Sequence, residues 1–271
     1  MTTPVGWAEP DQRPLTRSPL VNVIWQLRFP PLPELTDGRM ALRFQKTLDR
    51  DTSLAPVAPQ ISVQVMAGDM APPVPVPVEQ PGQAWRLSAR DGSTHVTLNA
   101  TSLAVETTQY GTWDEHFQPW VTAAVNALAE TADPGVVLRI GVRYVNALFG
   151  AALGRGPFTD TSDFRDVVVP SLLGFLADQN LGASVEAFQG RHLLKADDTI
   201  THVQHALATA DTGEIGLLLD VDTYVEQTSE FKKGDILAVT ERLHLASLAV
   251  FQHCITRGAW EAMEPVGREA Q

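Results

Sequence analysis

Alternating apolar and polar positions predict strands in both halves of the chain. In Val21–Phe29 every odd-numbered side chain is apolar, and this period of two is typical of a half-buried strand. In Thr36–Leu48 apolar residues recur at helical spacing behind Thr36, a residue type that caps helices. The remainder of the first half predicts a short strand at 61–66, a meander of strands at 85–89, 95–98 and 103–110, and a helix opened by the capping box Thr112–Glu115.

The second half predicts a similar order of elements. We expect a strand at 137–148, a broadly helical segment at 164–177, strands at 185–188, 201–209 and 215–225, and a long apolar helix at 235–256. Arg28 within Leu27-Arg-Phe29 matches Arg143 within Val142-Arg-Tyr144, and Tyr110 matches Tyr224, at offsets of 115 and 114 residues. Two nearly equal offsets inside one element order favour an internal duplication, although short strands can also align by chance.

These patterns predict an α+β fold made from a duplicated β-α-β-β-β-α unit, with an antiparallel sheet and helices on one face. By element order alone, this resembles the saddle of TATA-binding-protein-like folds. We expect a flexible tail at 1–18, the first repeat at 19–133, the second at 134–257 and a C-terminal tail at 258–271. The glycine-rich stretch at 150–156 is interpreted as the link between the repeats.

Composition narrows the classes of function. The chain has 271 residues and a formal net charge of −12, which repels nucleic-acid phosphates and disfavours general nucleic-acid binding. No apolar run approaches the roughly 18 residues of a membrane span, and the N-terminus does not resemble a signal peptide. The single cysteine, Cys254, suits a reducing compartment. We therefore expect a cytoplasmic protein that does not bind membranes.

Strand parity selects a candidate binding face. Side chains that oppose the apolar positions of a strand should lie on the side of the sheet left open by the helices. Seven residues are candidates for this face: Arg28, Glu106, Tyr110, Arg143, Asp220, Asp222 and Tyr224. The guanidinium groups could clamp a carboxylate or phosphate. They could equally form ordinary surface ion pairs with the acids.

Other residue types offer weaker candidates for chemistry. Asp220 and Asp222 share one strand face and could hold Mg²⁺, but no further ligand can be named. His202 and His205 lie three apart on a predicted strand and therefore face opposite sides. His244 and Cys254 fall among apolar residues, so we expect a packed histidine and an inert thiol. We expect neither a catalytic constellation nor a cofactor nor a metal site.

Several motifs also resemble a known group of sequences. They are Pro19–Phe29 with its Leu-Arg-Phe ending, Arg143-Tyr-Val-Asn146, Leu219-Asp-Val-Asp222, and the helix that contains Leu243-His244. In this order they resemble a sporadically distributed bacterial family of uncharacterised proteins of about this length. The resemblance implies an accessory or defence-related bacterial locus and assigns no activity.

These observations favour a non-enzymatic binding or interaction protein acting through the open sheet face, although catalysis stays open. The alternative is a small-molecule sensor that binds an anion through the Arg/Tyr face. A metal-dependent hydrolase using Asp220 and Asp222 is the least favoured function. A protein partner or a second copy is the expected ligand, and the proline-rich segment at 71–81 is a further candidate contact.

Overall fold

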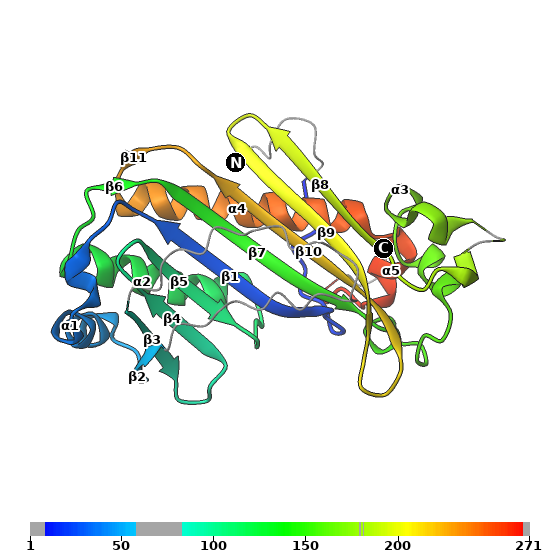
Figure 1. The fold of residues 1–271 in the computed structure, drawn as a ribbon, viewed down its shortest axis with the longest axis horizontal. Coiled ribbons are helices and arrows are strands. Elements are labelled where there is room, and N and C mark those ends of the chain that lie inside the picture. Colours follow the sequence, from blue (N-terminus) through cyan, green and yellow to red (C-terminus); the bar gives the residue numbers. More distant parts are fainter. Residues whose placement is uncertain (1–8, 58–82, 179, 181, 268–271) are drawn as a thin grey trace. The chain divides into compact units, whose positions relative to one another are not determined.

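The computed structural model describes residues 9–57, 83–178, 180 and 182–267, and it is a mixed α+β fold with a large antiparallel sheet (Figure 1). Among these residues, nine strands form one sheet in the order β2-β3-β4-β5-β1-β7-β10-β9-β8, and β11 pairs with β6. The strands are β1 (Leu20–Arg28), β2 (Thr52–Val57), β3 (Ala84–Ala89), β4 (Thr94–Leu98), β5 (Ser102–Thr107), β6 (Val136–Val137), β7 (Arg139–Leu148), β8 (Gln189–Ala196), β9 (Thr199–Thr209), β10 (Ile215–Val225) and β11 (Ser229–Glu230).

Helices pack on this sheet, as the sequence predicts. The helices are α1 (Gly38–Leu48), α2 (Gln118–Thr131), α3 (Pro170–Leu173), α4 (Lys233–Cys254) and α5 (Arg257–Ala262). Shorter helical turns are η1 (Pro33–Thr36), η2 (Trp113–Phe117), η3 (Gly150–Leu153), η4 (Thr161–Asp166), η5 (Gly174–Ala177) and η6 (Gly182–Ser184). The predicted strand at 61–66 and the proline-rich segment at 71–81 lie outside the described residues.

The chain forms two compact units, and each is built from separated segments. Unit 1 comprises the described residues within 1–21, 143–223 and 242–271, and unit 2 comprises those within 22–142 and 224–241. In unit 2 the strand order is β2-β3-β4-β5-β1, and in unit 1 it is β7-β10-β9-β8. Internal duplication stays a prediction, because element order alone does not demonstrate superposition.

The core of unit 2 is built on the alternation that the sequence predicts. Val23, Trp25 and Leu27 of β1 are fully buried, and Trp25 lies opposite Val105 of β5. The Trp25 indole Nε1 donates a hydrogen bond of 2.9 Å to Oγ1 of Thr240, in the first part of α4. A buried N–H without an acceptor would be costly, so this bond lets the largest side chain of the strand face the helix.

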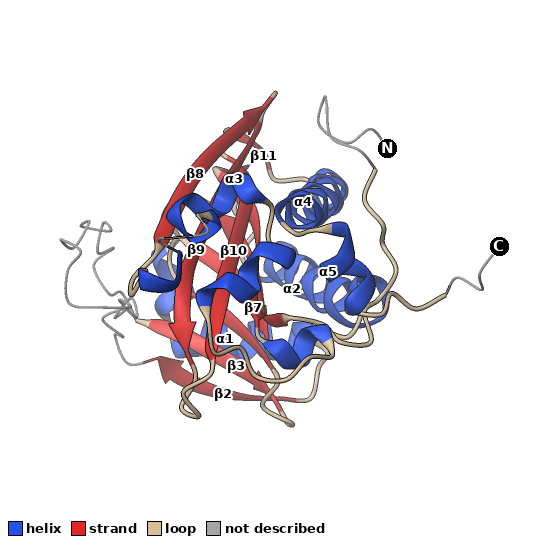
Figure 2. Cartoon of the chain, turned by 90° about the vertical axis from the view of Figure 1, so that its right-hand side faces the viewer, coloured by secondary structure: helices blue, strands red, loops and turns tan. Residues whose placement is uncertain are grey.

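In unit 1 the apolar faces of β9 and β10 pack beneath the end of α4. Val203, Leu219, Phe251 and Cys254 belong to one buried cluster, together with Phe164 of η4. Figure 2 shows α5 and the end of α4 on the same side of these strands. The opposite faces of the strands are therefore available to carry polar side chains.

Some element boundaries differ from the expectation because local hydrogen bonds decide them. Asp37, not Thr36, caps α1, since its carboxylate accepts a bond of 2.8 Å from the backbone N–H of Arg39. Thr112 does accept a bond from the N–H of Glu115, but the first turn that follows it is a π-helix. The segment at 164–177 is split into short pieces, with Pro170 starting α3 and Gly174, at a φ of 51°, ending it.

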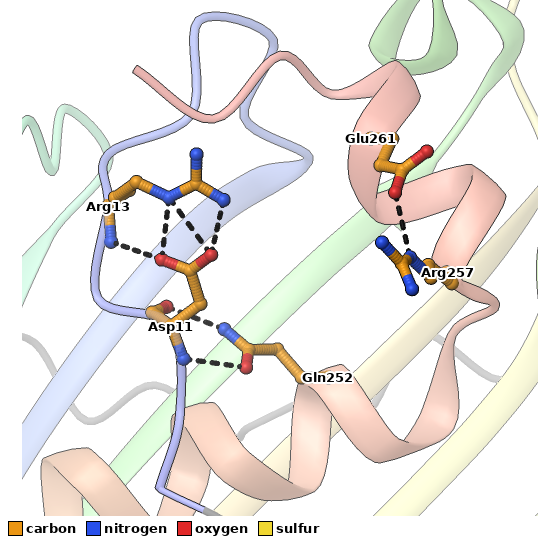
Figure 3. A network of polar contacts seen from close by, with 5 residues as sticks. All are labelled: Asp11, Arg13, Gln252, Arg257 and Glu261. Atoms are coloured by element: carbon orange, nitrogen blue, oxygen red, sulfur yellow. Dashed lines mark hydrogen bonds and ion pairs between the residues drawn. The ribbon is translucent and has the colours of Figure 1, made fainter. Parts of the chain in front are cut away.

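The described part of the expected N-terminal tail, residues 9–18, is held in unit 1. Leu15 forms an antiparallel bridge with Pro265, and the Asp11 backbone exchanges two hydrogen bonds with the Gln252 side-chain amide of α4 (Figure 3). The hydrogen bonds from Arg13 hold the pKa of Asp11 below its usual range. Hydrophobic periodicity cannot predict the position of such a segment. Hydrogen bonds of its backbone and side chains hold it in place, and it has no regular stripe of apolar residues.

Candidate binding face

The open face of unit 1 carries a paired arginine and aspartate. The open face here means the strand face opposite the buried residues. Arg143 on β7 is exposed between the buried Val142 and Tyr144, as parity predicts. Its Nε donates to Oδ1 of Asp220 at 2.9 Å and its Nη2 donates to Oδ2 at 2.6 Å. This bidentate geometry is the strongest form of an arginine–carboxylate pair.

Asp222 and Tyr224 share the parity of Asp220 along β10. Both are half-buried, whereas Val221, Thr223 and Val225 between and beyond them are buried on the other face. The guanidinium carbon of Arg139, on β7, lies 4.3 Å from the centroid of the Tyr224 ring, which is a cation–π contact. Tyr224 and Arg139 both belong to unit 2, whereas Asp222 belongs to unit 1.

The sequence reasoning missed Arg139, although a neighbouring glycine provides a signal for it. Arg139 Nη1 donates a bond of 3.0 Å to Oε1 of Gln26 on β1. A Cβ atom at Gly141 would lie 2.7 Å from that same Nη1. Gly141 therefore leaves the space through which the guanidinium of Arg139 runs along the strand.

The remaining candidates of unit 2 lie on β1, on β5 and just after β5. Glu106 on β5 faces Ile24 in the strand register and accepts a bond of 2.7 Å from the Asn22 amide. Arg28 is half-buried at the end of β1, opposite Ser102. Tyr110 follows the end of β5, and its ring lies 6.0 Å from that of the buried Phe117.

The structure thus brings together Arg143 with Asp220, whereas Arg28 and Glu106 lie four register positions apart along the pair of strands β1 and β5. The functional equivalence of Arg28 and Arg143 stays a prediction. An anionic ligand that used the Nε and Nη2 donors of Arg143 would have to displace the Asp220 carboxylate. The same two hydrogen bonds engage both carboxylate oxygens of Asp220, which a metal ion would need as ligands. Within the described residues, no group of three or more His, Cys, Asp or Glu side chains is placed to hold a metal ion.

His244 and Cys254 of unit 1 are buried, as their apolar neighbours in the sequence predict. The Tyr144 hydroxyl lies 2.6 Å from Nδ1 of His244, and burial lowers the pKa of this histidine to about 3. Burial also raises the pKa of the Cys254 thiol to about 12, so the thiolate nucleophile is scarce.

Strand β8 forms an end of the sheet, and six of its eight residues are exposed. It pairs with β9 along its whole length, from Gln189 opposite Ala206 to Ala196 opposite Thr199. Leu193 is 64% exposed, and the strand carries Arg191, His192 and Lys195 without any acid. The predicted strand at 185–188 ended just before β8, because a strand exposed on both faces does not show apolar alternation.

Along the part of the chain that the structure describes, no helix has both the length and the apolar character needed to cross a membrane.

Comparison with known proteins adds no family to this description. No protein-family model matches the chain, and no curated protein matches it.

Proposed function

We propose that this is a binding protein that docks an extended, acidic segment of a partner protein along β8 and the adjoining open face of unit 1. The observation that carries the proposal is the terminal, exposed and basic strand β8. A terminal strand offers backbone N–H and C=O groups to an added strand, which is a common mode of peptide recognition. An accessory or defence-related bacterial locus remains part of the proposal through the resemblance alone.

Charge favours an acidic partner over a second copy of the chain. Arg191, Leu193 and Lys195 lie on the open face, because they pair with Gln204, His202 and Ile200 and not with the buried side chains of β9. An acidic segment would place carboxylates beside both cations while contacting Leu193. Pairing β8 with itself would bring the same cations together, and like charges across strands are destabilising.

The pair of Arg143 on β7 and Asp220 on β10, which β9 separates from β8, supplies a preformed polar surface on the open face of unit 1. Two hydrogen bonds already fix the side chains of Asp220 and Arg143, so little side-chain entropy is lost when a partner covers them. Leu218, which is 37% exposed on β10, adds apolar area on the same strand face as Asp220.

Photo-crosslinking in the cells that encode the protein tests this function. A photoreactive phenylalanine is placed at Leu193, and the matched control is placed at Leu42 of α1, which is also an exposed leucine, at 51%. We expect one discrete adduct with an acidic protein from position 193 and none from position 42. The double variant Arg191→Glu/Lys195→Glu should lose this adduct, whereas Arg90→Glu/Lys233→Glu, with the same charge change at exposed sites, should keep it.

Other outcomes of the crosslinking would contradict the proposal. An adduct between two copies of the chain would identify self-association through β8 instead. Identical adducts from positions 193 and 42, or no adduct from 193, would remove β8 as a docking strand.

A further inference from the structure

Two histidines meet across β8 and β9, on the strand face opposite Leu193. His205 faces Gly190 in the strand register and His192 faces Val203, so both side chains lie on the face that carries the buried residues of β9. Their Nε2 atoms are 3.2 Å apart, their ring planes differ by 12° and the ring centroids are 5.4 Å apart. The two Nε2 atoms therefore lie within hydrogen-bond distance, where the Nε2 proton of one ring can be donated to the other.

His205 is the fixed member of this pair. Its side chain is buried, its ring lies 5.0 Å from that of Phe188, and a Cβ atom at residue 190 would lie 2.3 Å from its Nε2. Gly190 therefore leaves the room that the imidazole occupies. Its Nδ1 has no hydrogen-bond partner among the described residues, so packing and the contact with His192 alone set the ring position.

The two histidines differ in burial. His205 is only 4% exposed, and its ring is fixed by its surroundings. His192, by contrast, is exposed and can rotate its ring without disturbing the core.

We propose that His192 and His205 form a two-histidine site for a divalent transition-metal ion of the Zn²⁺ and Cu²⁺ class. Imidazole nitrogens select these ions over Mg²⁺ and Ca²⁺, which take oxygen ligands. Two nitrogens bound about 2.0 Å from one tetrahedral ion are about 3.3 Å apart, close to the 3.2 Å between the two Nε2 atoms. For the ion to bind, the ring that carries its proton on Nε2 changes to the tautomer protonated on Nδ1, so that both rings present an Nε2 lone pair to the ion. Water fills the other positions.

The metal site does not depend on the proposed docking function. Arg191 and Leu193 lie on the other face of β8, and the guanidinium Nη2 of Arg191 contacts Nδ1 of His202 at 3.0 Å. His202 is thus a histidine of the same strand pair that faces away from the site, which makes it a matched control.

Titration of the purified full-length protein with Cu²⁺ tests the site, with electron paramagnetic resonance as the readout. We expect one strongly bound equivalent whose hyperfine pattern reports two imidazole nitrogens. His192→Ala should reduce the pattern to one nitrogen and weaken binding at least tenfold, while His202→Ala should change neither. Because His192 is exposed, this variant keeps its fold.

A second variant tests His205 as the other ligand and distinguishes a lost ligand from a lost fold. His205→Gln should cause the same tenfold weakening, with circular dichroism confirming that the fold is retained. If His192→Ala binds Cu²⁺ as tightly as the unsubstituted protein, or if His202→Ala loses as much affinity, the two-histidine site does not exist. Binding without any nitrogen hyperfine coupling would also overturn the proposal.

Discussion

Arg143 and Asp220 are joined by two hydrogen bonds, from Nε to Oδ1 at 2.9 Å and from Nη2 to Oδ2 at 2.6 Å, between the neighbouring strands β7 and β10. The arginine side chain is 45% exposed, whereas that of the aspartate is 15% exposed. The partly buried acid makes this pair stronger than an ordinary surface contact.

A double-mutant cycle should therefore detect coupling between the two side chains. We expect Arg143→Ala, Asp220→Ala and the double variant to give a coupling of about 1 kcal/mol in the free energy of unfolding, at the upper end for partly exposed pairs. Urea denaturation measures it. The control cycle uses Arg257 and Glu261, an exposed i,i+4 pair on α5, for which we expect less than about 0.5 kcal/mol. Equal values in both cycles would show that the bidentate geometry adds nothing.

Two glycines of one loop should respond differently to alanine. A Cβ atom at Gly150 would lie 2.0 Å from the carbonyl oxygen of Gly156, whereas a Cβ at Gly156 would meet nothing within 4 Å. Backbone atoms cannot move aside as the end of a side chain can. We expect Gly150→Ala to lower the free energy of unfolding by about 1–3 kcal/mol and Gly156→Ala to leave it within about 0.5 kcal/mol. Thermal melts compare them, and a neutral Gly150→Ala would contradict this loop geometry.

Acid should destabilise the protein through His244. Its pKa of about 3 in the folded state lies below that of an exposed histidine, so the unfolded chain binds the proton first as the pH falls. The free energy of unfolding begins to fall near pH 6.5. It falls by up to about 1.4 kcal/mol per pH unit until the folded-state pKa of His244 is reached.

Substitution of His244 should remove this part of the pH dependence. Asparagine can place a polar atom where Nδ1 meets the Tyr144 hydroxyl, yet it does not titrate. Between pH 7 and pH 5, we expect the free energy of unfolding of His244→Asn to fall by about 2 kcal/mol less than that of the unsubstituted protein. His253→Asn, on the exposed side of the same helix, should keep the original pH dependence. Denaturant titrations at several pH values measure this dependence. Identical pH profiles for His244→Asn and the unsubstituted protein would refute the contribution of His244.

The single cysteine provides a probe of unfolding. Cys254 is buried and burial raises the pKa of its thiol to about 12, so the folded protein presents almost no thiolate. We expect iodoacetamide to label the folded protein at least tenfold more slowly than the protein in urea, as followed by mass spectrometry. A cysteine introduced at the exposed Ser184 would serve as a control that reacts in the folded state. Equally fast labelling at residue 254 would show that the end of α4 is not packed as described.

Much of the sheet could be predicted because burial on one face leaves a period of two in the sequence. The parity of Asp220 and Asp222 on β10 and of Arg143 on β7 follows from that period. Strand β8 gave no such signal, since it is exposed on both faces.

Contacts between distant segments could not be read from the sequence. Periodicity relates His205 only to residues of its own strand, such as His202, whereas its contact with His192 depends on the register of β8 against β9. Tyr110 was assigned to a strand that in fact ends at Thr107, after which the chain turns and the ring meets Phe117. Strand parity has no meaning beyond the last paired residue, so it could not place this tyrosine.

Unit 2 joins an early strand, β1, to the first part of α4, which is synthesised much later. Trp25 emerges from the ribosome 215 residues before Thr240, the acceptor of its indole hydrogen bond. At usual translation rates that interval is about 10–40 s. During this interval the indole N–H of Trp25 lacks its native acceptor, so this buried contact of β1 can form only after the first part of α4 has been synthesised.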